Sequence, residues 1–144
     1  MNAAAGPIVW RLHIPAPPDT VFAALDSDEG RAGFWAESAV ETAAVIHFKF
    51  PDGTSHAAPI LDRTPPARFA IEYFGVPATF ELTSDGRGGT DLVLTHEGVG
   101  ADEWHEVHAG WLSVLLPLKA WVAHGVDLRN HDPGRTWAQG YVDQ

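Results

Sequence analysis

The chain has no cysteine among its 144 residues. Disulfide bonds, thiolate nucleophiles and metal sites built from thiolates are therefore excluded. A chain without cysteine fits a reducing compartment, and we expect a cytoplasmic protein.

Basic residues are scarce, and none lies between Arg87 and Lys119. Nine Lys and Arg stand against nineteen Asp and Glu, which gives a formal net charge of −10. A chain of this charge repels a phosphate backbone and an anionic lipid surface, so we expect no nucleic-acid partner. Apolar runs stay well below the roughly 18 residues of a membrane span, and the opening MNAAAGPIVW lacks the features of a signal peptide.

Aromatic and apolar residues are plentiful. Hydrophobic residues make up 45% of the chain, with six Trp and seven Phe. This length and composition predict one globular domain over 1–144. The polar stretch 125–144 reads as a C-terminal extension. It carries Trp137 and Tyr141, which we expect to pack against another surface, and a homodimer contact through them is left open.

The spacing of apolar residues predicts one strand over 8–14, two short helices before Trp35, and then about five or six antiparallel strands up to His96. The turn Pro51-Asp52-Gly53 separates two of these strands.

A single helix is expected over 102–124, with Pro117 inside it. Its apolar stripe consists of Trp104, Val107, His108, Trp111, Leu115, Leu118 and Val122. The order of elements predicts an α+β fold in which a curved antiparallel sheet wraps around this helix. Such an arrangement leaves a cavity between the sheet and the helix.

Three histidines raise the question of chemistry. His105 and His108 are three residues apart on the helix, and His96 is expected to face the same interior. Their side-chain directions agree only in part, so we expect no zinc and no other cofactor. Proton transfer by His96 and His108, with Tyr73 or Glu97, stays open as an alternative.

Several stretches resemble a known family. They are PPDTVFAALDSDEGRAGFWA, FKFPDGTSHAAPILDRTPPARFAIEYF, and TFELTSDGRGGTDLVLTHEGV followed by GW and LK. Over about 7–122 the chain resembles the START-type helix-grip superfamily, also called SRPBCC, in the branch named after the activator of the heat-shock-protein ATPase. The resemblance implies a helix-grip fold with a deep, mostly apolar cavity. Its members include binders of small molecules, enzymes and co-chaperones, and fold alone does not choose among them.

The periodicities of strands and helix together predict a pocket for a small apolar or aromatic molecule. Its expected contacts are Phe34, Trp35, Phe48, Phe50, His56, Phe69, Ile71, Tyr73, Phe80, Leu94, His96, His108, Trp111, Leu115 and Leu118. The histidines and Tyr73 are the expected polar points. A cyclase, dehydratase or hydrolase that uses the pocket histidines and a co-chaperone-like module that binds a protein are the two alternatives.

Overall fold

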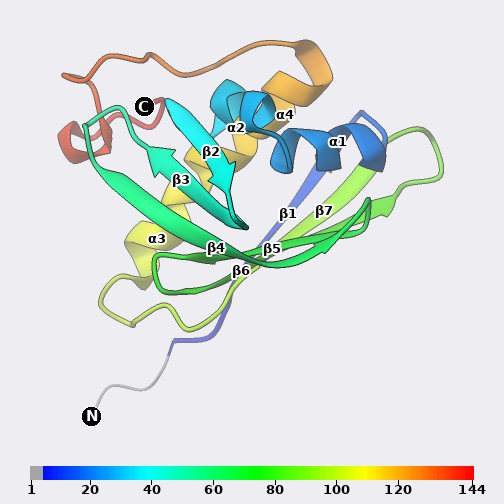
Figure 1. Cartoon of the computed structure of the whole chain (residues 1–144), viewed down its shortest axis with the longest axis horizontal. Coiled ribbons are helices and arrows are strands. Elements are labelled where there is room, and N and C mark those ends of the chain that lie inside the picture. The colour runs from blue at the N-terminus through cyan, green and yellow to red at the C-terminus, as the bar shows by residue number, and fades with distance from the viewer. Residues whose placement is uncertain (1–4) are drawn as a thin grey trace.

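The computed structural model describes residues 5–144 and shows an α+β fold built on one antiparallel sheet (Figure 1). The sheet has seven strands in the order β1-β7-β6-β5-β4-β3-β2, so β1 pairs with the last strand of the chain. The strands are β1 (Ile8–Ile14), β2 (Ser38–Thr42), β3 (Val45–Lys49), β4 (Ser55–Thr64), β5 (Arg68–Tyr73), β6 (Val76–Ser84) and β7 (Thr90–His96).

The helices lie together on one face of this sheet (Figure 1). They are α1 (Pro18–Leu25), α2 (Asp28–Phe34), α3 (Trp104–Gly110), α4 (Leu112–His124) and the short 3-10 helix η1 (Trp137–Gln139). After α4 the chain, coloured orange to red, runs back across the helical side of the molecule. Within residues 5–144, no helix is long and apolar enough to cross a membrane.

Strand periodicity decides which side chains face the helices. In β3 Phe48 is buried and His47 is exposed, while in β7 Leu92, Leu94 and His96 are all buried. The predicted fold is confirmed in its main features: a curved antiparallel sheet, two short helices after the first strand and a long helical element at the end.

The predicted helix over 102–124 is present as two consecutive segments. α3 ends at Gly110 and α4 begins at Leu112, while Trp111 between them keeps helical angles (φ −61°, ψ −27°). Glycine has a low helix propensity, and the segments meet directly after it. Pro117 lies inside α4 as expected, and it is buried.

Arg31 is a buried charge that the sequence patterns did not reveal. Its side chain is 0% exposed, and its Nε and Nη1 atoms donate to the carbonyls of Ala39 and Leu25, each at 3.0 Å. Its Nη2 atom donates to the Asp28 carboxylate at 2.6 Å. Burial lowers the pKa of Arg31 from its usual value, and the ion pair with Asp28 works against that shift. Arg31 therefore ties α1, α2 and β2 together.

We predict that Arg31→Met lowers the free energy of unfolding by about 2–4 kcal/mol, because two buried carbonyls and a carboxylate lose their donor. Urea unfolding followed by tryptophan fluorescence measures this effect. Arg68→Met is the matched control, since the Arg68 side chain is 53% exposed and makes an ion pair with Asp62 on the surface. It should change stability by less than about 0.5 kcal/mol. Equal losses in the two variants would contradict a special role for Arg31.

Candidate functional site

A pocket of about 650 Å³ opens between one end of the sheet and the C-terminal helices. The β3–β4 and β5–β6 connections border it on the sheet side. α3 and the first turn of α4 border it on the helix side, and the tail after α4 forms a third side. The site is therefore built from segments far apart in the sequence.

The inner wall of the pocket is aromatic. Trp35 follows α2, Tyr73 ends β5, and Trp111 joins α3 to α4. The ring centroids lie 5.5 Å apart for Trp35 and Tyr73 and 5.3 Å apart for Tyr73 and Trp111. The Trp35 indole donates to the Tyr73 hydroxyl at 3.2 Å. These three rings form a wall that is packed before any ligand arrives.

His96 lines the same inner end, and both of its ring nitrogens are occupied. Its Nδ1 atom accepts from the Trp111 indole at 3.0 Å, so Nε2 carries the proton and donates to the Tyr73 carbonyl at 3.2 Å. Burial is the largest effect on its pKa and lowers it from 6.5, although hydrogen bonds to the backbone of Tyr73 and Val76 oppose the shift. His96 is therefore held neutral and in a single tautomer.

One face of the helices lines the pocket. Glu103, Val107, Gly110 and Val114 recur every three or four residues and all border the cavity. A Cβ atom at Gly110 would meet no other atom within 4 Å. The missing side chain at Gly110 therefore contributes open space beside the aromatic wall. The sequence predicted that Val107 faces inward, but it did not identify Glu103, Gly110 or Val114 as residues of the pocket.

Thirteen of the fifteen predicted contact residues divide into two sets, and His56 and His108 belong to neither. Those that line the pocket are Trp35, Phe50, Tyr73, His96 and Trp111. Those that lie in the core behind the wall are Phe34, Phe48, Phe69, Ile71, Phe80, Leu94, Leu115 and Leu118, and each is at most 2% exposed. The core set fills the space between sheet and helices, as close packing requires.

The prediction that His108 faces inward beside His96 is wrong. The His108 ring is stacked between Trp10 and Trp104, with centroid distances of 4.4 and 4.6 Å. The physical reason is the rotation of α3, which turns Val107 and Gly110 toward the pocket and leaves His108 against β1. This stack, which the Trp10 indole reinforces by donating to the His108 carbonyl at 2.9 Å, lies outside the pocket.

The mouth of the pocket contains an exposed phenylalanine in an unusual backbone conformation. Phe74 has φ 52° and is 59% exposed, in the tight β5–β6 turn with Gly75. Its ring stacks on Phe50 at 6.1 Å and on His56 at 4.2 Å. His56 Nε2 accepts the backbone N–H of Phe74 at 3.0 Å. His56, a predicted contact, thus supports the mouth from behind and does not line the cavity.

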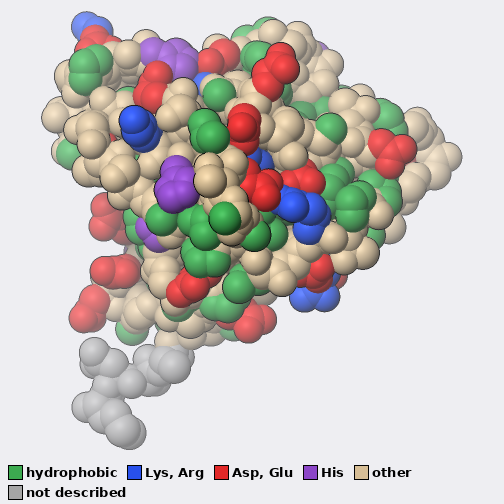
Figure 2. Space-filling view, in the orientation of Figure 1, with side chains coloured by type: hydrophobic (Ala, Val, Ile, Leu, Met, Phe, Trp, Pro, Cys, Tyr) green, Lys and Arg blue, Asp and Glu red, His purple; other side chains and the backbone are tan. Residues whose placement is uncertain are grey.

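Acidic side chains surround this mouth. Asp52, Glu103 and Glu106 line the pocket, and no Lys or Arg of residues 5–144 does so. Hydrogen bonds from the Thr54 side chain and backbone lower the pKa of Asp52. Figure 2 shows acidic side chains spread over one face of the molecule, with few basic ones between them. The pocket is thus negatively charged, as the chain as a whole is.

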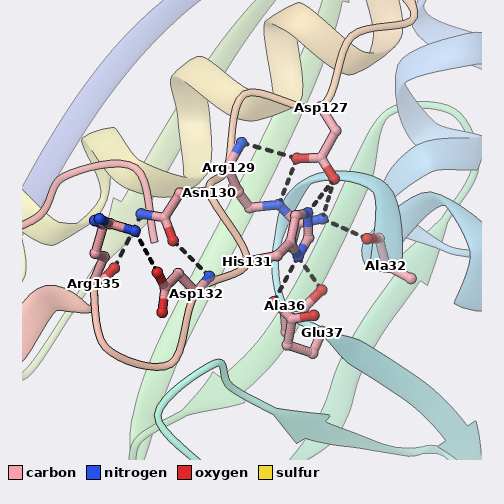
Figure 3. A network of polar contacts seen from close by, with 9 residues as sticks. All are labelled: Ala32, Ala36, Glu37, Asp127, Arg129, Asn130, His131, Asp132 and Arg135. Carbon is pink, nitrogen blue, oxygen red and sulfur yellow. Dashed lines mark hydrogen bonds and ion pairs between the residues drawn. The ribbon is translucent and has the colours of Figure 1, made fainter.

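Arg129 anchors the tail to α2 (Figure 3). Its guanidinium is buried and donates to the carbonyls of Ala36 and Ala32 at 2.6 and 2.5 Å. It also makes an ion pair with Asp127, with Nε at 2.9 Å from the carboxylate. These bonds satisfy carbonyls at the end of α2 that no helical N–H reaches. Sequence reasoning missed Arg129, which carries no periodic signal.

His131 adds a second link between the tail and the body of the protein. Its ring nitrogens lie 2.7 Å from the carboxylates of Glu37 and Asp127 (Figure 3). The hydrogen bond with Asp127 is the main reason why the pKa of His131 is raised. Burial raises the pKa of Asp127, but hydrogen bonds from Arg129 and His131 outweigh burial and lower it to about 2. The link is therefore charged on both sides when His131 is protonated.

The anchored tail returns to the pocket. Trp137, Ala138 and Gln144 line it, and the Trp137 indole donates to the Glu106 carboxylate at 3.0 Å. The expectation that Trp137 packs against another surface is met within the chain, whereas Tyr141 is 41% exposed. The extension is thus one wall of the site.

Metal binding has no visible basis in the described part of the chain. Among residues 5–144, no three His, Asp or Glu side chains converge in a way that could hold an ion. His96 is buried at the pocket, while His105 is exposed and packs edge-on against Trp104.

The family model described as Activator of Hsp90 ATPase homolog 1-like protein matches residues 15–123. The chain belongs to this family. The match extends from the end of β1 to the end of α4, and it confirms the resemblance seen in the sequence. The tail that closes the pocket lies beyond the matched residues.

Solved structures share the fold. Protein SSP2350 from Staphylococcus saprophyticus is 22% identical with a TM-score of 0.75, over 85% of this chain and 96% of its own. The Aha1 dimer from Colwellia psychrerythraea is 21% identical with a TM-score of 0.74, over 84% and 98%. Protein BH1534 from Bacillus halodurans is 20% identical with a TM-score of 0.69, over 84% and 99%. No curated protein sequence matches the chain.

We predict that His96 makes stability depend on pH below about 6.5. The unfolded chain binds a proton at His96 near pH 6.5, whereas the native pKa is lower, so the contribution of His96 to stability falls as pH decreases below this value and is constant above it. The slope is at most about 1.4 kcal/mol per pH unit. Urea unfolding between pH 5 and 8 should show that His96→Gln loses this component. The exposed His47 supplies the control, His47→Gln, which should retain it. Parallel curves for wild type and His96→Gln would contradict the prediction.

We predict that Arg129→Met releases the tail. Amide hydrogen exchange in 126–144 should accelerate at least about tenfold, because several charge-assisted hydrogen bonds are lost together. Exchange followed by mass spectrometry resolves this segment from the sheet. Arg135→Met is the matched control, since Arg135 lies in the same tail but its side chain is 58% exposed. Equal acceleration in both variants would show that Arg129 is no anchor.

Proposed function

We propose that the protein binds a small apolar or aromatic molecule in the pocket between the sheet and the C-terminal helices. The observation that carries this proposal is the space beside a packed aromatic wall, about 650 Å³ next to Trp35, Tyr73 and Trp111. Small-molecule sites are typically concavities of about 300–1,000 Å³ with apolar walls and a few polar groups. This pocket has that size and that composition.

An enzymatic role has less support from the same residues. A general base needs a free lone pair within reach of the substrate. The Nδ1 lone pair of His96 accepts the Trp111 indole, and its Nε2 proton is donated to a carbonyl. His108, the other histidine considered for proton transfer, stacks between two indoles outside the pocket. Proton transfer by these two histidines therefore has little support in the geometry.

A co-chaperone-like role is the second candidate, and the family favours it. The matching family model is described by the activator of the Hsp90 ATPase, and one structural neighbour is an Aha1 dimer. Such a role requires an external surface rather than a cavity. A variant that fills the pocket without changing the surface separates the two functions. The same neighbour supports a homodimer as part of the proposal, which sedimentation analysis of the purified chain tests.

We predict that Gly110→Leu weakens ligand binding without loss of stability. The new side chain enters open space that borders the pocket, and replacing a helical glycine adds up to about 1 kcal/mol of stability. Nile red, a neutral apolar dye, serves as the probe, and its fluorescence reports binding. Its affinity should fall at least about tenfold, which corresponds to 1.4 kcal/mol.

Gly100→Leu is the matched control for this experiment. A Cβ atom at Gly100 also meets no atom within 4 Å, but Gly100 does not line the pocket. Its affinity for Nile red should equal that of the wild type. If Gly110→Leu binds the dye as tightly as Gly100→Leu does, the pocket is not the binding site, and the co-chaperone-like role becomes the better candidate.

A further inference from the structure

Tyr73 carries a hydroxyl proton with no partner in the described chain. Its oxygen accepts the Trp35 indole at 3.2 Å, and no oxygen or nitrogen of residues 5–144 accepts the proton in return. An indole N–H is only a donor, so Trp35 cannot take this proton. Both residues line the pocket. The phenol is therefore a hydrogen-bond donor with one unused bond.

The Tyr73 hydroxyl remains a hydrogen-bond donor throughout the physiological pH range. Burial raises the pKa of Tyr73 well above its usual value of 10.0, so the hydroxyl stays protonated at every physiological pH. A polar group held in aromatic surroundings without its full set of partners costs free energy. Water or a ligand oxygen must supply the missing acceptor.

The other donors at the inner end of the pocket are already used. The Trp111 indole donates to His96 Nδ1, and His96 Nε2 donates to the Tyr73 carbonyl. The Trp35 indole donates to Tyr73 itself. At this aromatic wall a ligand therefore finds one free donor, and it belongs to Tyr73.

The acidic mouth restricts the charge of the acceptor. A carboxylate or phosphate would satisfy a phenol, but it would have to pass Asp52, Glu103 and Glu106. No Lys or Arg of residues 5–144 lines the pocket to compensate for its charge, and neutral His96 adds none. An unpaired anion in an apolar pocket is strongly disfavoured.

We propose that the ligand is an uncharged aromatic molecule with a carbonyl or similar acceptor oxygen, and that this oxygen accepts the hydrogen bond of the Tyr73 hydroxyl. Tyr73 is thereby the residue that determines specificity for an oxygenated ring over a plain hydrocarbon. This inference rests on the proposed function, because it presumes that the pocket binds a small molecule.

The experiment compares three probes on the same ring system: acetylnaphthalene, isopropylnaphthalene and naphthoate. The first offers a neutral acceptor, the second has a substituent of similar size without an acceptor, and the third is an anion. Equilibrium dialysis against the full chain measures the affinity of each probe for wild type, Tyr73→Phe and Tyr141→Phe. Tyr141 is the only other tyrosine and does not line the pocket, so Tyr141→Phe is the matched control.

We expect Tyr73→Phe to weaken the binding of acetylnaphthalene about tenfold and to leave isopropylnaphthalene unchanged or tighter. Tyr141→Phe should alter neither affinity. Naphthoate should bind wild type at least about tenfold more weakly than acetylnaphthalene. Equal weakening of both neutral probes by Tyr73→Phe, or tight binding of naphthoate, overturns this inference and leaves the proposed function intact. If none of the three probes binds wild type, the proposed function fails as well.

In Tyr73→Phe the Trp35 indole loses its acceptor, so misfolding of this variant would confuse the comparison. An infrared measurement on the wild type avoids this problem. The carbonyl stretch of bound acetylnaphthalene should lie at lower frequency than in an alkane solvent, because the hydrogen bond weakens the C=O bond. The alkane frequency in the bound state would show that no donor reaches the oxygen, and it would overturn the inference without any variant.

Discussion

The hydrogen bond from the Trp111 indole to His96 holds the helices against the sheet at the place where the pocket begins. Both side chains are 2% exposed, and the bond of 3.0 Å joins β7 to the junction of α3 and α4. A buried donor or acceptor without a partner costs about 1–3 kcal/mol, so this pairing favours one rotation of the helices over its neighbours. That rotation turns Gly110 toward the cavity and leaves His108 between Trp10 and Trp104. The pocket and its inner polar groups depend on this contact.

Two buried guanidinium groups, those of Arg31 and Arg129, hold α2 in place behind the aromatic wall. Arg31 donates to the carbonyls of Leu25 and Ala39, and Arg129 donates to those of Ala32 and Ala36. Arg31 thereby joins α2 to α1 and β2, and Arg129 satisfies carbonyls at the C-terminal end of α2, the helix that is followed by Trp35 of the aromatic wall. Because Arg129 belongs to the tail, the extension contributes to the site twice. It forms a wall through Trp137, and it holds the helix behind another wall.

The hydrogen bonds that build the pocket also limit its chemistry. His96 uses both ring nitrogens for structure, so it contributes a neutral, oriented group and no free base. The inner wall of the pocket is aromatic, while the mouth is acidic. An aromatic wall with a few polar groups is typical of the small-molecule site that we propose. Among residues 5–144, the hydroxyl proton of Tyr73 is the one donor at the wall without an acceptor, and it distinguishes the inner end of the pocket from the apolar core.

The sequence by itself determined the layers of this protein. Period-two strands, a final apolar helix and the turn residues between them predicted a curved sheet that packs on a long helix, and they placed Trp35, Tyr73, His96 and Trp111 on its inner side. Only the tertiary structure decided which of the inward residues line empty space and which fill the core. Periodicity gives the direction of a side chain to within one helical position, and His108 shows that one position is enough to leave the pocket. The role of Gly110 was not predicted for the same reason, and Arg129 lies outside any periodic element. A cavity is a property of the space that several distant segments leave between them, and no local pattern records it.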